Sequence, residues 1–300
     1  MVPTQLPISD GGFLGFKSLK KLELKFMVDL GDLTPFLSNC PALEWLSITR
    51  SFIAHLVVPQ ICCLNYLHVG TCVMESIELH AKNLKTFEYD GSPDLQIKMQ
   101  VSSNLSQASI HLYWYFDAVG YFWDELACLL CQVDRLFLSF GMDGKTTRLV
   151  KYPTTFVHLR HLTLFCKIYG YPISALAILR LTQILEAAPR LEHFVLHMSS
   201  FVWESSFLHS TDCIHPQVHN HLKTVLMTGV FGLSGQLELA KYILLSAQAL
   251  EFMTLNLAKN GYPDVPWEPN HTYFSRLKKL AKNYLDPLGV YSNVLKIIGL

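Results

Sequence analysis

Charged residues are scarce in this sequence. Only 16% of its 300 residues are Asp, Glu, Lys or Arg, whereas an ordinary soluble domain has about 25%. The 24 basic residues balance the 24 acidic residues, so the formal net charge is zero. A balanced chain has no overall field that attracts nucleic acid. We therefore expect no nucleic-acid partner.

The sequence also lacks segments that direct a protein to a membrane or into the secretory pathway. No apolar run reaches about 18 residues without a charge, and residues 1–15 have neither the basic region nor the long apolar region of a secretion signal. We expect a cytoplasmic or nuclear protein with no membrane contact. In such a compartment the eight cysteines, which lie mostly inside apolar runs, are predicted to be reduced and buried.

A phosphate-binding loop is missing as well. Residues 139–147 end in Gly-Lys-Thr, but such a loop needs a glycine where Ser139 stands and a helix after the threonine, because the helix N-terminus must face the phosphates. Only six residues separate Thr146 from Pro153, too few for that helix. A polar turn between two repeats explains the segment better.

Metal-binding and nucleophile motifs are incomplete too. Cys128 and Cys131 have the spacing of a zinc-binding pair, but a zinc site needs two further ligands, and these cysteines are expected on a core-facing helix. Ser234 lacks the G-x-S-x-G spacing of a hydrolase nucleophile. We predict a protein that is not an enzyme, with no catalytic residue, no cofactor and no metal site.

What the sequence does contain is a repeated motif, L-x-x-L-x-L, with apolar substitutions at its three positions. Nine copies begin at Leu19, Leu43, Leu64, Leu84, Val133, Leu159, Leu191, Leu222 and Leu250. Successive copies start 20 to 32 residues apart, except for one interval of 49 residues after Leu84. We expect this interval to hide a degenerate copy with Ile110 and Leu112 in its strand.

The motif predicts one short strand in each repeat. Its first apolar residue points inward at the turn into the strand, and the next two alternate with exposed residues, as the twofold period of a strand requires. One repeat cannot bury its apolar side alone, so the repeats stack. Motif and period are those of a leucine-rich repeat. The predicted fold is an α/β leucine-rich-repeat solenoid, with a curved parallel sheet on the concave side and helices and turns on the convex side.

Several repeats have room for a helix before the strand. In residues 173–198, apolar residues at helical spacing include Leu176, Pro189 ends the helix, and Leu191 begins the strand. Other helices are expected at residues 32–37, 123–131, 237–244 and 273–285. Between Val58 and Ser109 the repeats shorten, and we expect turns or extended segments. The copy that starts at Leu64 also matches the longer form of the motif, with Cys at its ninth position, so Cys72 is expected to face inward as a structural residue.

Three stretches resemble plant F-box/leucine-rich-repeat proteins that carry an FBD region. Residues 39–48, NCPALEWLSI, are similar to the family's join between helix and strand. Residues 77–91, IELHAKNLKTFEYDG, are similar to one of its repeats, and residues 221–254 resemble its FBD core. The resemblance covers about residues 16–257. It implies a tail over residues 1–15, leucine-rich repeats over 16–214, FBD-like final repeats continuous with the solenoid over 215–258, and a connector with a C-terminal capping helix over 259–300.

The resemblance also implies the role of a substrate receptor of a ubiquitin ligase. In such a receptor an F-box binds a Skp-type adaptor, and the repeats hold the target. Residues 1–15 are too short for an F-box, so a Skp-type adaptor is expected only if an F-box exists elsewhere. The chain is then the target-binding part of such a receptor, or a truncated relative that binds targets without recruiting a ligase.

The residues between the strand leucines are expected to face the concave side and to bind a protein target. These candidate binding residues are Glu44, Trp45, Asn65, Tyr66, Arg160, His161, Glu192 and His193. A receptor that depends on a small ligand is the alternative, with a pocket formed by the aromatic and loop-rich residues 113–123 and 201–221. The basic cluster Lys17, Lys20, Lys21 and Lys25 is expected to be a solvated face.

Overall fold

The computed structural model describes residues 16–28, 30–99, 104–112, 118–145, 154–170, 173–200, 217–233, 235–257 and 271–299. The chain divides into two compact units, the first made of Met1–Trp114 and Tyr121–Leu136, the second of Tyr115–Gly120 and Phe137–Leu300. Each unit is built on parallel strands, one for each copy of the repeated motif, which confirms the α/β leucine-rich-repeat solenoid.

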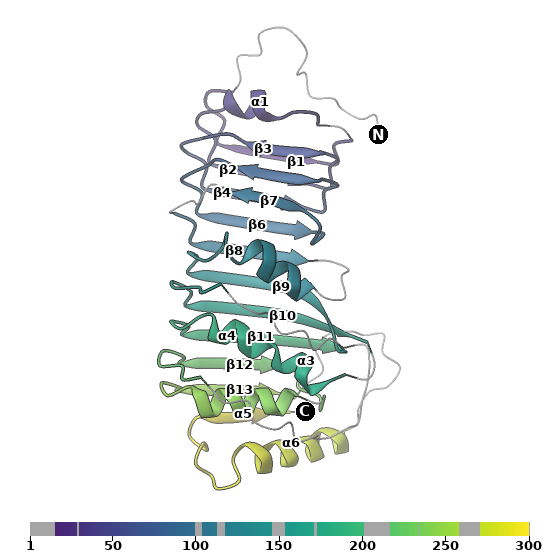
Figure 1. The fold of residues 1–300 in the computed structure, drawn as a ribbon, viewed down its shortest axis with the longest axis vertical. Coiled ribbons are helices and arrows are strands. Elements are labelled where there is room, and N and C mark those ends of the chain that lie inside the picture. The colour runs from purple at the N-terminus through teal and green to yellow at the C-terminus, as the bar shows by residue number, and fades with distance from the viewer. Residues whose placement is uncertain are drawn as a thin grey trace. The chain divides into compact units, whose positions relative to one another are not determined.

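The first unit contains two parallel sheets. Its larger sheet has the order β1 (Lys21–Lys25), β2 (Trp45–Thr49), β4 (Tyr66–Gly70), β6 (Thr86–Gly91) and β8 (Gln107–Leu112). A smaller sheet is formed by β3 (His55–Val58), β5 (Ser76–Leu79) and β7 (Gln96–Met99). Strands of the two sheets alternate along the chain (Figure 1). The extended segments expected between residues 58 and 109 are therefore strands of a second sheet.

The three apolar positions of the motif form the core. In the second copy, Leu43, Leu46 and Ile48 are all fully buried. Leu46 lies in register with Leu67 of β4, which lies in register with Phe87 of β6. Equivalent residues of successive repeats therefore stack on one another, and the core runs from repeat to repeat.

The long interval after Leu84 does hide a degenerate copy. Its apolar residues are Leu105, Ala108 and Ile110, all buried, and β8 contains Ile110 and Leu112 as expected. Ala108 stands in register with Phe87, at the place of the motif's second leucine. The small side chain explains why the pattern is hard to recognise in the sequence.

The second unit contains a single parallel sheet among its described residues. Its strands follow the chain order: β9 (Arg135–Asp143), β10 (His161–Tyr169), β11 (His193–Ser200), β12 (Thr224–Thr228), β13 (Phe252–Asn256) and β14 (Leu295–Ile298). The helices of the whole described chain are α1 (Thr34–Ser38), α2 (Ala118–Tyr121), a π-helical turn η1 (Phe122–Leu126), α3 (Ala175–Leu179), α4 (Leu181–Glu186), α5 (Gln236–Ser246) and α6 (His271–Leu285). The apolar tail after residue 290 thus caps the last repeat as a strand paired with β13.

The helix expected from residue 173 is two short helices, α3 and α4, that meet at Arg180. The hydroxyl of Thr182 donates a hydrogen bond to the carbonyl of Leu179 at 2.8 Å, and such back-bonding bends helices. Ser174 caps α3 by accepting a hydrogen bond from the amide of Leu176. Leu176, one of the apolar residues at helical spacing, is 48% exposed and does not belong to the core.

The cysteines are also more exposed than expected. Only Cys40 and Cys166 are buried among the seven described; Cys62, Cys63 and Cys128 are exposed, and Cys72 and Cys131 are half-buried. Cys62 and Cys63 occupy the turn just before a strand, where the repeat faces solvent, and Cys128 and Cys131 lie in the turn after η1 rather than on a core-facing helix. The Sγ of Cys72 lies 3.4 Å from the carbonyl oxygens of Ile48 and Gly70, and burial raises the pKa of its thiol. Cys213 lies outside the described residues.

The segment that ends in Gly-Lys-Thr is not a turn at its start. Strand β9 continues through Asp143, so Ser139 belongs to a strand, and the turn begins only at Gly144. Thr146 and Thr147 lie outside the described residues. In the described part of the chain, no helix is both long and apolar enough to cross a membrane.

Candidate protein-binding faces of the two sheets

Each strand of the larger sheets places alternate residues on the side opposite the leucine core, which we call the outward face. In the first unit one row of this face consists of Lys21, Trp45, Tyr66, Thr86 and Gln107, which lie in register on β1, β2, β4, β6 and β8. A second row, two residues further along each strand, includes Ser47, His68 and Glu88. Both rows occupy x positions of the motif. Because successive side chains of a strand point to opposite faces, these side chains point away from the leucine core.

Aromatic rings stack at the start of these strands. The rings of Trp45 and Tyr66 lie 5.2 Å apart with an interplanar angle of 4°. The ammonium group of Lys21 lies 4.1 Å from the centroid of the Trp45 ring, in a cation–π contact. The Tyr66 hydroxyl donates a hydrogen bond to Glu88 Oε2 at 2.7 Å. Burial, helped by this bond, raises the pKa of Tyr66, so the hydroxyl keeps its proton and the platform stays fixed.

A groove of about 440 Å³ crosses the C-terminal ends of β1, β2, β4 and β6 on this face. It is lined by Glu23, Lys25, Phe26, Trp45, Ser47, Thr49, Arg50, His68, Gly70, Thr71 and Asp90. Ser47 and Gly70 are the small residues among its walls, and the Ser47 hydroxyl lies 3.2 Å from Nδ1 of His68. Its volume is in the range of ordinary ligand-binding clefts.

The rim of the groove is made by residues in a left-handed backbone conformation. Phe26, Arg50 and Thr71 each follow a strand and have φ values of 57°, 51° and 54°. Each backbone N–H donates to the carbonyl that ends the next strand: Phe26 to Thr49, Arg50 to Gly70 and Thr71 to Asp90. This conformation is unfavourable by about 1–2 kcal/mol for each non-glycine residue, and strained residues gather at functional sites.

The strained turns hold two large side chains out into solvent. Phe26 is 63% exposed, and the Arg50 guanidinium lies 5.3 Å from its ring centroid. Lys25 pairs with Glu23 at 2.8 Å, which lowers the pKa of the Glu23 carboxyl. The rim therefore combines an exposed aromatic ring with an exposed guanidinium, the kinds of group that anchor protein interfaces.

An unsatisfied acceptor lies at the far end of the groove. Oδ1 of Asp90 is buried and has no hydrogen-bond partner. Its neighbour in register is His111. Burial lowers the pKa of His111, and the carboxylates of Asp90 and Glu88 oppose this only in part, so the imidazole is neutral at pH 7. A bound molecule that donates a hydrogen bond would satisfy Asp90.

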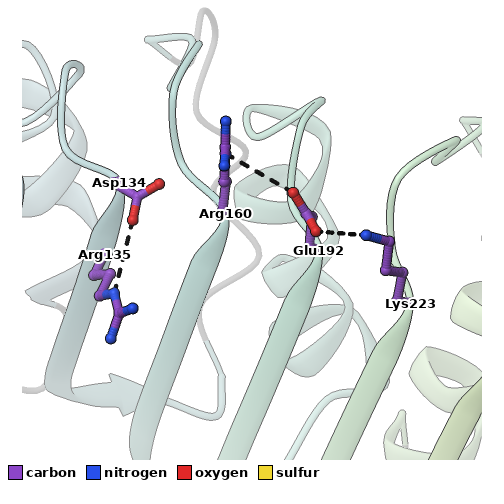
Figure 2. A network of polar contacts seen from close by, with 5 residues as sticks. All are labelled: Asp134, Arg135, Arg160, Glu192 and Lys223. Atoms are coloured by element: carbon purple, nitrogen blue, oxygen red, sulfur yellow. Dashed lines mark hydrogen bonds and ion pairs between the residues drawn. The ribbon is translucent and has the colours of Figure 1, made fainter.

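In the second unit, a row of charges joins the residues that precede successive strands. Glu192 lies between Arg160, whose Nε is 3.8 Å from Oε1, and Lys223, whose Nζ is 2.7 Å from Oε2 (Figure 2). The bond to Lys223 lowers the pKa of Glu192 and raises that of Lys223. The carbonyl of Arg160 accepts hydrogen bonds from the amides of Glu192 and His193. The ion pairs of Glu192 thus join three neighbouring repeats. Asp134 and Arg135, which are adjacent in the chain at the start of β9, also form an ion pair (Figure 2).

Histidines occupy the outward face of the second unit. The rings of His161 and His193 stack with centroids 4.7 Å apart. Nδ1 of His193 lies 2.7 Å from the hydroxyl of Thr224, and Nδ1 of His197 lies 2.7 Å from that of Thr228. The outward face of this unit therefore has stacked aromatic rings, and Lys167 of β10 and Lys296 of β14 add positive charge to it.

The LRR domain model of the At1g61320/AtMIF1 family matches residues 9–276. The chain belongs to this family. The matched range contains every strand from β1 to β13 and so spans repeats of both units. No curated protein matches the chain. Because leucine-rich repeats present extended binding surfaces, membership of this leucine-rich-repeat family identifies the chain as a protein-interaction scaffold of a typically non-enzymatic class.

The candidate residues expected from the sequence fall into two groups. Trp45, Tyr66, His161 and His193 begin strands and lie on the outward faces, in the first and second units respectively. Glu44, Asn65, Arg160 and Glu192 lie one residue earlier, where their carbonyls receive the amides of the next repeat. Glu44 also pairs with Lys20 at 2.9 Å.

Sequence reasoning missed most of the groove. Alternation along the strands could have added Ser47 and His68, whereas nothing in the local sequence marks Phe26 and Arg50 as left-handed residues. Lys21 is exposed, as expected of a solvated face, and its ammonium group also lies over the Trp45 ring. The ligand pocket expected at residues 113–123 and 201–221 lies largely outside the described residues. Among those described, no group of three or more His, Cys, Asp or Glu is placed to hold a metal.

Proposed function

We propose that this chain is the target-binding part of an F-box-type ubiquitin-ligase receptor and holds a protein target on the outward face of the first unit. The observation that carries the proposal is the groove lined by Phe26, Arg50 and Trp45, whose ring stacks on that of Tyr66. Aromatic and arginine side chains on a rigid platform provide most of the energy of many protein interfaces. Because the platform is already stacked, binding does not have to order it.

In this proposal the eight candidate residues form one binding face in each unit. Trp45 and Tyr66 of the first unit and His161 and His193 of the second unit contact target proteins, while Glu44, Asn65, Arg160 and Glu192 line the edges where the strands begin. The edge residues already have partners in neighbouring repeats. We therefore expect mutation of the edge residues to weaken target binding less than mutation of the groove.

The link to a ubiquitin ligase rests on the resemblance of residues 39–48, 77–91 and 221–254 to F-box/FBD proteins. A Skp-type adaptor then joins the complex only through an F-box. A location in the cytoplasm or nucleus agrees with the exposed free thiols of Cys62, Cys63 and Cys128, because such thiols persist in reducing compartments. If the chain is instead a truncated relative that binds targets without recruiting a ligase, it uses the same face.

Binding of a small ligand is the second candidate function. The groove volume of about 440 Å³ suits a small molecule, and the unpartnered Oδ1 of Asp90 requires a donor. A ligand that copurifies with the chain in stoichiometric amount, and is lost from Asp90→Asn, would favour this function over direct binding of a protein.

The test compares proteins captured from plant extract by the tagged chain and by the double variant Phe26→Asn/Arg50→Asn. Asparagine tolerates the left-handed conformation, so the variant removes the rim without straining the turns. The matched control, Phe52→Asn, removes an aromatic ring that is 52% exposed and absent from the groove lining. We expect the parent and the control to capture target proteins that the double variant does not capture. Skp-type adaptor and cullin among them would support the ligase role; identical sets from all three proteins would contradict the binding face.

A further inference from the structure

The solvent side of α6 carries positive charge alone. The helix has 15 residues and no acidic one, and its basic residues are Arg276, Lys278, Lys279 and Lys282. All four side chains are exposed. The chain as a whole has as many acidic as basic residues, 24 of each, so this concentration is a local feature. The apolar side of α6 is buried through Phe274, Leu277, Ala281 and Leu285.

A groove of about 210 Å³ runs between this helix and β14. It is lined by Lys278, Lys282, Asp286, Ser292, Leu295 and Ile297. Leu295 and Ile297 lie in register with Met253 and Leu255 of β13, which are fully buried. On β14 the same positions are only half-buried. The groove thus has apolar residues of the core side on one wall and two lysines on the other.

The acidic residue in the groove is already engaged. Asp286 is 7% exposed; its Oδ1 accepts a hydrogen bond from the amide of Tyr291, and its Oδ2 accepts one from the hydroxyl of Ser292. It holds the turn before β14. Within the described part of the chain, neither Lys278 nor Lys282 forms an ion pair with a carboxylate. Both ammonium groups remain available to an outside anion.

We propose that α6 and β14 form a docking site for an acidic segment of a partner protein that also carries apolar side chains. The carboxylates of the segment pair with Lys278, Lys279 and Lys282, and its apolar side chains cover Leu295 and Ile297. Lys278 and Lys282 are one helical turn apart, about 5–6 Å between Cβ atoms, which suits two acidic residues on one side of a segment. The site lies on the core side of the second unit's sheet, so it does not overlap the outward face of that unit.

The experiment measures binding of a labelled synthetic peptide, in which glutamate alternates with leucine, to the purified 300-residue chain by fluorescence anisotropy. Two comparison peptides replace every glutamate by glutamine or every leucine by serine. The test variant is Lys278→Glu/Lys282→Glu. The matched control is Lys17→Glu/Lys98→Glu, which changes the net charge equally at two exposed lysines. Circular dichroism verifies that both variants keep the fold.

We expect the glutamate–leucine peptide to bind the parent and the control, and its affinity to fall at least tenfold for the test variant and with rising salt. Both comparison peptides should bind at least tenfold more weakly. Equal binding to test and control variants, or equal binding of the glutamine peptide, would overturn the proposal. It would also be overturned if duplex DNA or phosphatidylserine vesicles bound through these lysines while the peptide did not.

Discussion

The indole of Trp45 and the phenol of Tyr66 lie face to face, with centroids 5.2 Å apart and planes only 4° from parallel. They begin adjacent strands, so the spacing of the sheet brings them together. Lys21 covers the other side of the tryptophan, and Glu88 accepts the tyrosine hydroxyl. Four strands therefore contribute to one fixed platform at the groove.

We predict that Tyr66→Phe keeps the stack but loses the hydrogen bond to Glu88. The free energy of unfolding should fall by about 0.5–1.5 kcal/mol, the usual net value of one such bond, or somewhat more because Glu88 is charged. Urea unfolding followed by circular dichroism measures the change. A Glu88→Gln variant should show a similar loss, and the double variant should lose less than the sum. Fully additive losses would contradict the direct bond.

We predict that Gln236→Leu is strongly destabilising. Gln236 is fully buried at the start of α5, and its Oε1 accepts hydrogen bonds from the amides of Phe231, Gly232 and Leu233. Leucine fills the same space but leaves these donors unpaired, which should lower the free energy of unfolding by about 3 kcal/mol or more. Gln248→Leu, at an exposed site, should change it by less than about 0.5 kcal/mol. Similar effects of the two variants would show that the hydrogen bonds of Gln236 to the amides of Phe231, Gly232 and Leu233 do not stabilise the protein.

We predict that alanine is more destabilising at Gly229 than at Gly31, two glycines with positive φ. Gly229 has φ of 69°, and a Cβ there would overlap the carbonyl oxygen of Met198. Gly31 has φ of 54°, but no atom lies within 4 Å of its added Cβ. Gly31→Ala should lower the free energy of unfolding by about 1–2 kcal/mol from the backbone conformation alone, and Gly229→Ala by clearly more. Equal losses in thermal or urea unfolding would refute the close approach.

We predict that the protein loses stability as the pH falls below about 6.5, the ordinary pKa of histidine. Burial lowers the pKa values of His111, His197 and His219 in the folded state. The unfolded state then binds more protons in this range, so stability is intact above the unfolded pKa and is lost as the pH falls towards the folded values. The slope approaches about 1.4 kcal/mol per pH unit for each such histidine.

The variant His219→Phe checks this origin. His219 is 4% exposed, and its ring packs against the edge of Tyr242, so phenylalanine fits the same space without titrating. Unfolding measured at pH 7 and at pH 5.5 should show a smaller difference for His219→Phe than for the parent. Gln248→Leu, at an exposed site without a titratable group, provides the control and should leave the difference unchanged. An unaltered slope in His219→Phe would assign the pH dependence to other groups.

The strands and their register were predictable because the period of two and the stacking of repeats allow only one arrangement of the leucines. The degenerate copy with Ile110 and Leu112 was predictable from the interval of 49 residues, whereas Ala108 at the motif's second position was not. The break between α3 and α4 was not predictable, since it depends on the hydroxyl of Thr182 turning back to Leu179. The exposure of Cys62 and Cys63 depends on the turn geometry before Leu64, which an apolar run does not reveal.

The groove was less accessible to sequence reasoning than the sheet. Trp45 and Tyr66 were identified because they occupy x positions of the motif. Phe26, Arg50 and Thr71 adopt a conformation usually left to glycine, and only the hydrogen bonds to the next strand hold them there. The orientation of Arg50 over Phe26 depends on tertiary contacts, so the shape of the site could not be predicted from the sequence.

The most direct test of the central claim is site-specific photocrosslinking from the groove in plant extract. A benzophenone amino acid replaces Phe26 in one tagged protein and Phe52 in another, since both side chains are more than half exposed. The account predicts that position 26, and not position 52, becomes joined to the same protein that affinity capture recovers. Equal crosslinking from both positions, or none from position 26 while the target remains captured, would place target binding elsewhere.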